Sequence, residues 1–303
     1  MVSIIIRTYN RKDYLIQALN SVRQQTYRDY EIIVVDDGST DGTIDLIESI
    51  GEIKLIKQNR DGYIKALNRG LQEASGEHIA ILDDDDLWDN AFLDRCLSVF
   101  NEYPDTSVVC CDYRYFYDNN IDKLFKAENK HRTDDVLGSL IHANFIPIDS
   151  ALTIKKSFEQ VGMFNEELTS HDDWDMWLRM AIAGFKFKFI PEPLIKIRKH
   201  GHGMTANKRN MFAGALCVLE KYKESIPSQY NKKMHLSLNR LSNILAVVII
   251  SEGKRNEGVN RLFKSINRGN YRGILYLFAA SLLPSVAINK FIKLYSKFLL
   301  RKA

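Results

Sequence analysis

The segment His78–Trp88, with the sequence HIAILDDDDLW, places four consecutive aspartates directly after a short apolar run. The run has the length and composition of a buried strand, so Asp83–Asp86 begin where a strand ends. Adjacent carboxylates repel one another, and burying them without a cation is very costly. Oxygen ligands at this density suit Mg²⁺ or Mn²⁺, and we expect a metal site here in preference to a solvated acidic turn.

Polar clusters also follow two earlier apolar runs, Val2–Ile6 and Glu31–Val35. Arg7–Asn10 come after the first run, and Asp36–Gly42 come after the second. The connection between the two runs has helical spacing, with apolar residues at Leu15, Ala18, Leu19 and Val22. Strands separated by helices of this length pair in parallel, and open parallel sheets bind ligands at the carboxyl ends of their strands. We therefore expect the three polar clusters to meet in one crevice.

The rest of the chain changes character twice. Beyond Ser107 the strand and helix signals are mixed, with a helix expected over Asp172–Ala183. Strands are expected at Phe185–Ile190 and Leu194–Ile197, separated by the sequence Pro-Glu-Pro. After Gly203 only helical signals remain. The sequence therefore predicts an α/β domain over residues 1–202 and an all-helical region over residues 203–303.

Composition and charge exclude several classes of protein. The 303 residues are 45% hydrophobic and 26% charged, as in ordinary soluble proteins. Basic residues are concentrated in Ser251–Ala303, where eleven Lys and Arg accompany two Glu, and the remainder is mildly acidic. A nucleic-acid binder would need basic residues over its functional face, so this charge distribution argues against nucleic-acid binding. The four cysteines form no C-x-x-C pair, so we expect no zinc site.

The two ends of the chain bear on localisation. No basic region followed by an apolar stretch opens the chain, so we expect a cytoplasmic protein. The uncharged stretch Gly273–Asn289 has 17 residues and contains Pro284, which is short of the about 20 apolar residues of a spanning helix. The last helix segregates its basic residues from its apolar face. Either it lies peripherally on an anionic membrane surface, or it packs on the domain. The basic residues are Lys290, Lys293, Lys297 and Arg301.

The segment Asp36–Gly42 (DDGSTDG) allows two interpretations. It forms either a turn whose Thr40 or Asp41 caps a helix, or a site whose carboxylate accepts hydrogen bonds from a nucleotide. The G-x-G-x-x-G and G-x-x-x-x-G-K phosphate-binding patterns are absent from the sequence. Bound phosphates would therefore be neutralised by a metal that the aspartates hold.

Six motifs, in order and over about the first two hundred residues, resemble the family 2 glycosyltransferases with the GT-A fold. They are SIIIRTYNR (3–11), VVDDGSTDG (34–42), ASGEHI (74–79), LDDDDLW (82–88), SHDDWDMWLR (170–179) and PLIKIRKH (193–200). The resemblance implies a Rossmann-like, mostly parallel mixed sheet flanked by helices. Its nucleotide-sugar half would span about residues 1–105, and its acceptor half about 106–202.

The resemblance also implies roles for individual residues. The donor nucleotide would be bound by Arg7, Thr8, Tyr9, Asp37, Asp83 and Asp84, with Tyr9 and Asp37 on the base. Asp85 would bind Mn²⁺ or Mg²⁺, and His200, in preference to His202, would complete the metal site. Asp173 would be the general base, with Asp172 and Trp174 on the acceptor side. Tryptophans at helical spacing are, however, more often core residues than sugar platforms.

The function implied is an inverting transfer of a hexosyl or N-acetylhexosaminyl group from a nucleotide diphosphate sugar, with UDP expected as the nucleotide. The acceptor would be a glycan or lipid-linked glycan of a bacterial surface polysaccharide. A sugar nucleotidyltransferase would also use carboxylates and a metal, but Arg7 and Arg11 alone do not make a triphosphate site. A catalytically inactive carbohydrate-binding or scaffold protein is the second alternative, and it would not need a base and a metal site together.

Overall fold

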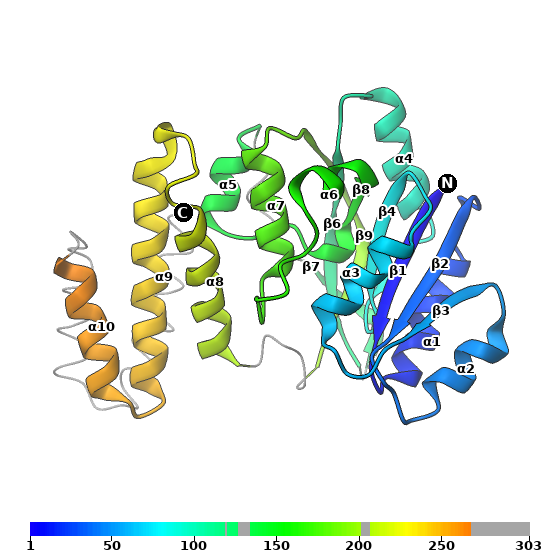
Figure 1. Ribbon diagram of the computed structural model, residues 1–303, viewed down its shortest axis with the longest axis horizontal. Coiled ribbons are helices and arrows are strands. Elements are labelled where there is room, and N and C mark those ends of the chain that lie inside the picture. Colours follow the sequence, from blue (N-terminus) through cyan, green and yellow to red (C-terminus); the bar gives the residue numbers. More distant parts are fainter. Residues whose placement is uncertain (119, 127–133, 201–206, 268–303) are drawn as a thin grey trace. The chain divides into compact units, whose positions relative to one another are not determined.

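The computed structural model describes residues 1–118, 120–126, 134–200 and 207–267 (Figure 1). The chain divides into two compact units, Met1–Gly203 and Met204–Ala303, and each is described by itself. In the first unit, nine strands in the described residues form one sheet in the order β3-β2-β1-β4-β8-β6-β9-β5, with β7 beside β6. The strands are β1 (Val2–Thr8), β2 (Tyr30–Asp36), β3 (Ile53–Lys57), β4 (His78–Asp83), β5 (Leu87–Trp88), β6 (Val108–Tyr117), β7 (Asn120–Lys126), β8 (Ala151–Ile154) and β9 (Phe187–Lys199).

Helices of the first unit alternate with the strands, as the sequence predicts. They are α1 (Lys12–Arg23), α2 (Thr43–Ile50), α3 (Tyr63–Glu73), α4 (Phe92–Glu102), α5 (Val136–His142), α6 (Lys155–Val161) and α7 (Asp172–Ile182), with a 3₁₀ turn η1 (Ile148–Ser150). The predicted apolar stripe of α1 packs in one cluster with Ile4 and Ile6 of β1. Helix α3 covers the other face, where a Cβ at Gly70 would lie 2.4 Å from Ile5 Cγ2. Both faces of β1 are therefore covered, which explains its uninterrupted apolar sequence.

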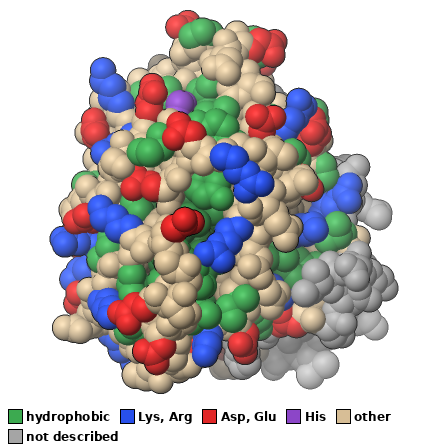
Figure 2. Space-filling view, turned by 90° about the vertical axis from the view of Figure 1, so that its right-hand side faces the viewer, with side chains coloured by type: hydrophobic (Ala, Val, Ile, Leu, Met, Phe, Trp, Pro, Cys, Tyr) green, Lys and Arg blue, Asp and Glu red, His purple; other side chains and the backbone are tan. Residues whose placement is uncertain are grey.

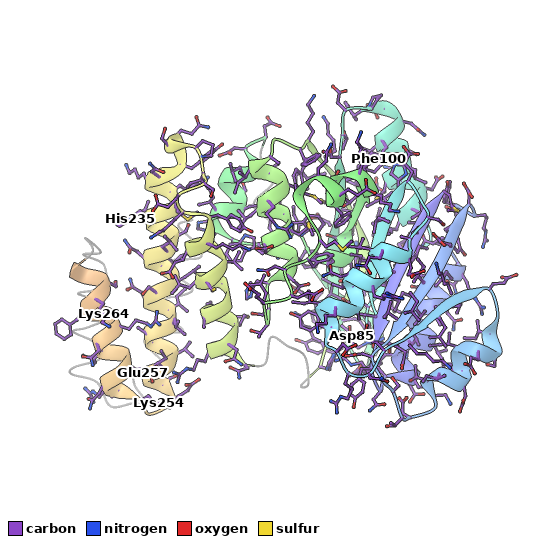
Figure 3. The ribbon with its side chains drawn as sticks, in the orientation of Figure 1. Asp85, Phe100, His235, Lys254, Glu257 and Lys264 are labelled. Atoms are coloured by element: carbon purple, nitrogen blue, oxygen red, sulfur yellow. The ribbon has the colours of Figure 1, made fainter. Side chains whose placement is uncertain are left out.

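The parallel register of the first four strands aligns their carboxyl ends. Arg7 pairs with Asp83 of β4, and Thr8 pairs with Asp36 of β2. Figure 3 shows Asp85 at this end of the sheet and Phe100 at the opposite end, where the Phe100 and His78 rings lie 4.7 Å apart. The three polar clusters expected to converge thus follow strands that end at one edge.

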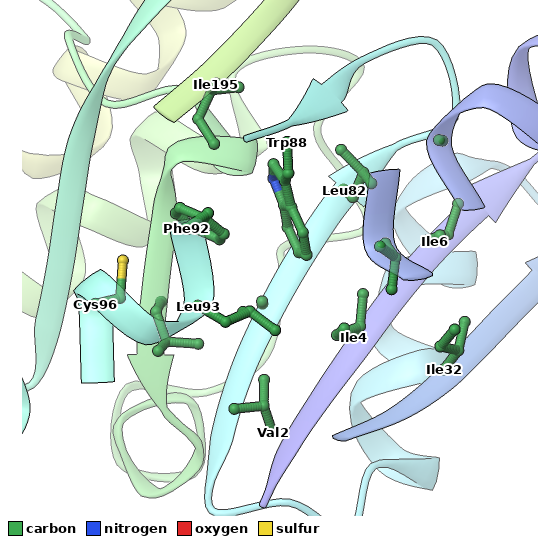
Figure 4. Packing of buried hydrophobic residues seen from close by; sticks show 14 of the residues in the cluster. Val2, Ile4, Ile6, Ile32, Leu82, Trp88, Phe92, Leu93, Cys96 and Ile195 are labelled. Atoms are coloured by element: carbon green, nitrogen blue, oxygen red, sulfur yellow. The ribbon is translucent and has the colours of Figure 1, made fainter. Parts of the chain in front are cut away.

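The core continues under the acidic turn. Trp88 and Phe92, with ring centroids 4.6 Å apart, pack between the strands and α4 (Figure 4). The indole N–H of Trp88 donates to the backbone oxygen of Asp149 at 3.0 Å. Because both residues are buried, the chain that follows Asp83–Asp86 is anchored in the core, unlike that of a solvated acidic turn.

The expected break between two strands at Pro191–Pro193 is wrong. A single strand, β9, runs through both prolines and pairs with β6 along its length. The register shifts between Cys111 and Tyr113, opposite the prolines. This irregularity admits residues that cannot donate to a ladder, and it lets β9 reach the acidic turn.

The second unit is helical in its described part, with α8 (Lys208–Tyr222), the 3₁₀ turn η3 (Ser228–Tyr230), α9 (Asn231–Ser251) and α10 (Arg255–Asn267). Helices α9 and α10 approach closely, since a Cβ at Gly258 would lie 2.4 Å from Ile250 Cγ1. By length and composition the helical stretch Ser228–Ser251 could cross a membrane, and half of its apolar 18-residue window is buried inside the protein. The basic face expected within residues 288–303 lies outside the described residues.

Acidic and basic side chains are interspersed over one face of the molecule (Figure 2).

Candidate active site

The acidic turn gathers three carboxylates. One oxygen from each of Asp83, Asp85 and Asp86 lies within 4.8 Å of the other two. The turn is closed by the N–H of Asp86, which donates to the Asp83 carbonyl at 3.2 Å. An oxygen-rich donor set of this size fits a hard divalent cation such as Mn²⁺ or Mg²⁺.

The end of β9 brings His200 to the same carboxylates. His200 Nε2 donates to Asp85 Oδ2 at 2.8 Å, and the His200 side chain is largely buried. The two residues expected to bind the metal therefore lie together, although they are 115 positions apart in the chain. Coordination by His200 would need the lone pair of Nε2, so binding a cation there would require the other tautomer. His202, the less favoured alternative, lies outside the described residues.

Arg198, two positions before His200, fixes this arrangement. Its guanidinium lies between the rings of Tyr14 and Phe116, at 4.6 and 4.5 Å. Its Nε donates to the backbone oxygen of Asp85 at 2.6 Å, and its backbone N–H donates to Asp86 Oδ1 at 2.7 Å. Sequence reasoning gave Arg198 no role of its own, because the chemistry comes from contacts across the fold.

Thr8 and Asp84 were expected to contact the donor, and in the structure they contact each other. Thr8 Oγ1 donates to Asp84 Oδ2 at 2.8 Å, and the two residues are only 3% and 5% exposed. The other oxygen, Asp84 Oδ1, accepts from Arg11 Nη1 at 2.9 Å. Burial raises the pKa of Asp84 to about 6. Both side chains are thus buried and paired beside the acidic turn, and contact of either with the donor stays a prediction.

A fifth carboxyl, that of Asp149, contacts the turn and was not found from the sequence. Asp149 Oδ1 accepts from the backbone N–H of Asp83 at 2.5 Å. Burial raises the pKa of Asp149 well above the usual range, and the charges of Asp83 and Asp86 raise it further. A carboxyl that holds a proton here can donate to Asp86, so the turn is supported by a buried carboxyl pair.

Tyr9 of the first polar cluster and Asp37 of the second each have partners in the segment that follows β3. Tyr9 is partly exposed, and the guanidinium of Arg60 lies 4.4 Å over its ring. Asp37 accepts from Gln58 Nε2 at 2.8 Å and from the Gly62 N–H at 3.2 Å. In the neighbouring turn, Asp41 accepts from both the N–H and the hydroxyl of Thr43. The N-cap of α2 is nevertheless Gly42, without a side-chain cap hydrogen bond, so the expectation that Thr40 or Asp41 caps the helix is wrong. Arg60 and Gln58 are additions to the predicted site.

Arg7 connects the acidic turn to the start of α7. Its Nη2 donates to Asp83 Oδ1 at 2.7 Å, and its guanidinium lies 4.7 Å over the ring of Tyr63. The Tyr63 hydroxyl donates to Asp172 Oδ1 at 3.1 Å. Arg7, which was expected to bind the donor, is thus already engaged with a carboxylate of the acidic turn.

Asp173 lies beside Asp172 in the first turn of α7. Its Oδ2 accepts from Asn144 Nδ2 at 2.7 Å, and its Oδ1 accepts from the Trp174 N–H. Burial, together with the charges of Asp172 and Asp83, raises the pKa of Asp173 to about 7. A carboxylate with this pKa can accept a proton near neutral pH, as a general base must.

Trp174 does not form the expected platform on the acceptor side. The residue is 3% exposed, and its indole N–H donates to the Leu140 carbonyl at 2.8 Å. Its faces are therefore packed in the core and unavailable to a sugar.

Comparison with known proteins identifies the family of the chain. The model of the family described as glycosyl transferase family 2 matches residues 3–162. An uncharacterised glycosyltransferase of Rickettsia typhi is 32% identical over 244 residues, which cover 77% of this chain and 72% of that protein. The chain belongs to glycosyl transferase family 2.

Another relative within this similarity is the putative teichuronic acid biosynthesis glycosyltransferase TuaG of Bacillus subtilis. It is 28% identical over 220 residues, which cover 69% of this chain and 82% of TuaG. As a member of family 2, this protein is a glycosyltransferase.

Solved structures confirm the predicted GT-A fold. S. aureus TarS 1–349 in complex with UDP-GlcNAc has a TM-score of 0.70 at 18% identity, over 92% of this chain and 87% of that one. The mannosyltransferase PcManGT from Pyrobaculum calidifontis, in complex with GDP-Man and Mn²⁺, has a TM-score of 0.65 at 19% identity, over 98% and 87%. At 18% and 19% identity, the likeness of this chain to these two structures concerns the fold alone.

Proposed function

We propose that this family 2 glycosyltransferase transfers a hexosyl or N-acetylhexosaminyl group from a UDP-sugar to a hydroxyl of a glycan or lipid-linked glycan, with inversion. The observation that carries the proposal is the placement of three groups at one sheet edge. These groups are the pair Tyr9 and Asp37, the carboxylates of the acidic turn, and Asp173. The name of TuaG, a putative teichuronic acid biosynthesis glycosyltransferase, supports a role in surface polysaccharide synthesis. The structure of TarS in complex with UDP-GlcNAc supports a UDP-sugar as the donor.

Each residue of the site has a separate role in the proposed reaction. The Tyr9 ring offers a face to the nucleobase, and Asp37 accepts a hydrogen bond from a base N–H. Asp85 and His200 would hold the divalent cation, with Asp83 and Asp86 beside them. When bound, the cation supplies Lewis-acid neutralisation of the charge that develops on the leaving diphosphate. Asp173 removes the proton of the acceptor hydroxyl as that oxygen attacks the anomeric carbon, and the diphosphate leaves from the opposite face.

A donor assay tests the reaction class. The full chain with Mn²⁺ is expected to release UDP slowly from at least one of UDP-glucose, UDP-galactose and UDP-GlcNAc, because water can replace the acceptor. Release of pyrophosphate from UTP and a sugar phosphate would instead identify a nucleotidyltransferase. Binding of the nucleotides without release of either product would identify an inactive binding protein.

The Asp37→Ala substitution is expected to weaken UDP binding by about ten- to a hundredfold, because a buried base N–H loses its acceptor. Isothermal titration calorimetry with UDP measures the change, and the dependence on Mn²⁺ stays as in the wild type. Asp45→Ala, which removes an exposed carboxylate from α2, serves as the control. Asp37→Asn keeps one acceptor oxygen and should fall between them. Equal UDP affinities for Asp37→Ala and Asp45→Ala would place the base elsewhere.

A further inference from the structure

Arg11 makes direct contact with the oxygen that the metal site needs. Its Nη1 donates to Asp85 Oδ2 at 2.8 Å and to Asp84 Oδ1 at 2.9 Å. The Asp85 atom is the one that accepts from His200 Nε2. One guanidinium nitrogen therefore bridges the two central carboxylates of the acidic turn.

The position of Arg11 lets its side chain leave without disturbing the fold. Its backbone carbonyl starts α1 by accepting from the N–H groups of Tyr14 and Leu15, at 3.1 and 2.9 Å. Its side chain is 33% exposed, in contrast to the buried Arg198. The backbone is therefore anchored, while the guanidinium lies at the open side of the acidic turn.

A divalent cation at Asp85 conflicts with this ion pair. Two cations that share one carboxylate oxygen repel each other strongly at a distance of a few ångströms. The contact between Arg11 and Asp85 must therefore break when a metal binds, whereas the contact with Asp84 can remain. A guanidinium displaced in this way stays beside the metal, where a diphosphate offers it oxygen acceptors in a fork geometry.

We propose that Arg11 is an internal competitor for the metal that becomes a ligand of the donor diphosphate. This inference rests on the proposed function. In the absence of nucleotide, the ion pair with Asp85 weakens metal binding. With the diphosphate present, Arg11 exchanges Asp85 for phosphate oxygens and the competition ends. Metal and nucleotide therefore bind cooperatively, through a coupling free energy that the two ligands share.

The test is a titration of the full chain with Mn²⁺, followed by the electron paramagnetic resonance of free Mn²⁺, with and without saturating UDP. Without UDP, Arg11→Gln should bind Mn²⁺ about three- to tenfold more tightly than the wild type, because a partly exposed ion pair no longer competes. With saturating UDP the advantage should vanish, since Arg11 of the wild type has then left Asp85 for the phosphate oxygens and no longer competes. The coupling between Mn²⁺ and UDP should fall by the same factor.

Lys12→Gln is the matched control, because it removes one positive charge from the next residue. The Lys12 ammonium lies 3.5 Å from the position of a Cβ at Gly42, and the described contacts of Lys12 include none with Asp83–Asp86. Lys12→Gln should change Mn²⁺ affinity by less than about twofold, as expected for a screened surface charge. Equal gains in the two variants would mean a general field effect and would overturn the role of Arg11. So would unchanged Mn²⁺ affinity in Arg11→Gln.

A second measurement uses the wild type and covers the case in which Arg11→Gln does not fold. The Nε–H resonance of Arg11, assigned with Arg11→Lys, should exchange faster with solvent when Mg²⁺ alone is added. An unchanged exchange rate at saturating Mg²⁺ would overturn the proposal. If the wild type bound neither Mn²⁺ nor Mg²⁺, even with UDP, the metal part of the proposed function would fail together with this inference. Binding without competition would refute only the inference.

Discussion

Replacing Asp85 with asparagine is expected to lower the rate of sugar transfer at least about 100-fold while leaving the protein folded. The substitution removes the carboxylate that accepts from both Arg11 and His200 at the centre of the acidic turn. Metal neutralisation of a leaving group contributes several kcal/mol to the transition state, which corresponds to at least about two powers of ten in rate. The fold should persist, because Arg11 keeps its contact with Asp84 and Arg198 binds the backbone of residue 85.

The measurement is UDP release at saturating UDP-sugar, together with a Mn²⁺ titration and a thermal melt of each variant. Asp105→Asn is the control, since its carboxylate is 84% exposed and pairs only with Lys186 among its described contacts. The control should transfer sugar at the wild-type rate. A wild-type enzyme that is unaffected by EDTA, or a folded Asp85→Asn variant with undiminished activity, would refute the metal assignment.

The elements of the first hundred residues could be predicted because local pattern and tertiary structure agree there. In β1 and α1 the apolar spacing matches the faces that are buried, and the polar residues follow the strand ends. Parallel pairing then aligns these ends, so the meeting of Asp37, Asp83 and Asp85 at one edge follows from topology. The strand β9 was harder to predict, because two prolines normally interrupt a strand. The register shift that accommodates them lies in its partner strand, β6.

The supporting residues of the site could not be predicted, because their roles depend on contacts between distant segments. Asp149, Arg198 and Asn144 each act on a residue that is 29 to 113 positions away in the chain. Asp149 and Asn144 lie outside the six motifs, and Arg198 lies inside PLIKIRKH (193–200), where the pattern alone gives it no chemical role. Trp174 shows the converse, since it lies inside a motif but its place in the helix buries it. A motif therefore located the site, and only the fold separated the exposed members from the buried ones.

Asp173→Asn is expected to lower the transfer rate by about 10²–10⁴-fold, the usual contribution of general-base catalysis. Asparagine keeps the size of the side chain and can still accept from one of the two donors, Asn144 Nδ2 or the Trp174 N–H, but it cannot take a proton. The UDP and Mn²⁺ affinities should stay near those of the wild type, because Asp173 is neither a base-pocket nor a metal residue. Asp94→Asn, an exposed acidic residue in the first turn of α4, controls for the loss of a charge at a helix start.

The pH dependence separates a base from a merely structural carboxylate. Because burial raises the pKa of Asp173 to about 7, the carboxylate is protonated below that pH and cannot accept the acceptor's proton. The wild-type rate of transfer should therefore fall about tenfold per pH unit below pH 7 and level off above pH 8. The residual rate of Asp173→Asn should be flat over the same range. Ionisation of a group with a raised pKa also costs folding stability, so at pH 8 the variant should melt no lower than the wild type. A folded Asp173→Asn protein that keeps more than about a tenth of the wild-type rate, or that keeps the acidic limb, would assign the base to another group.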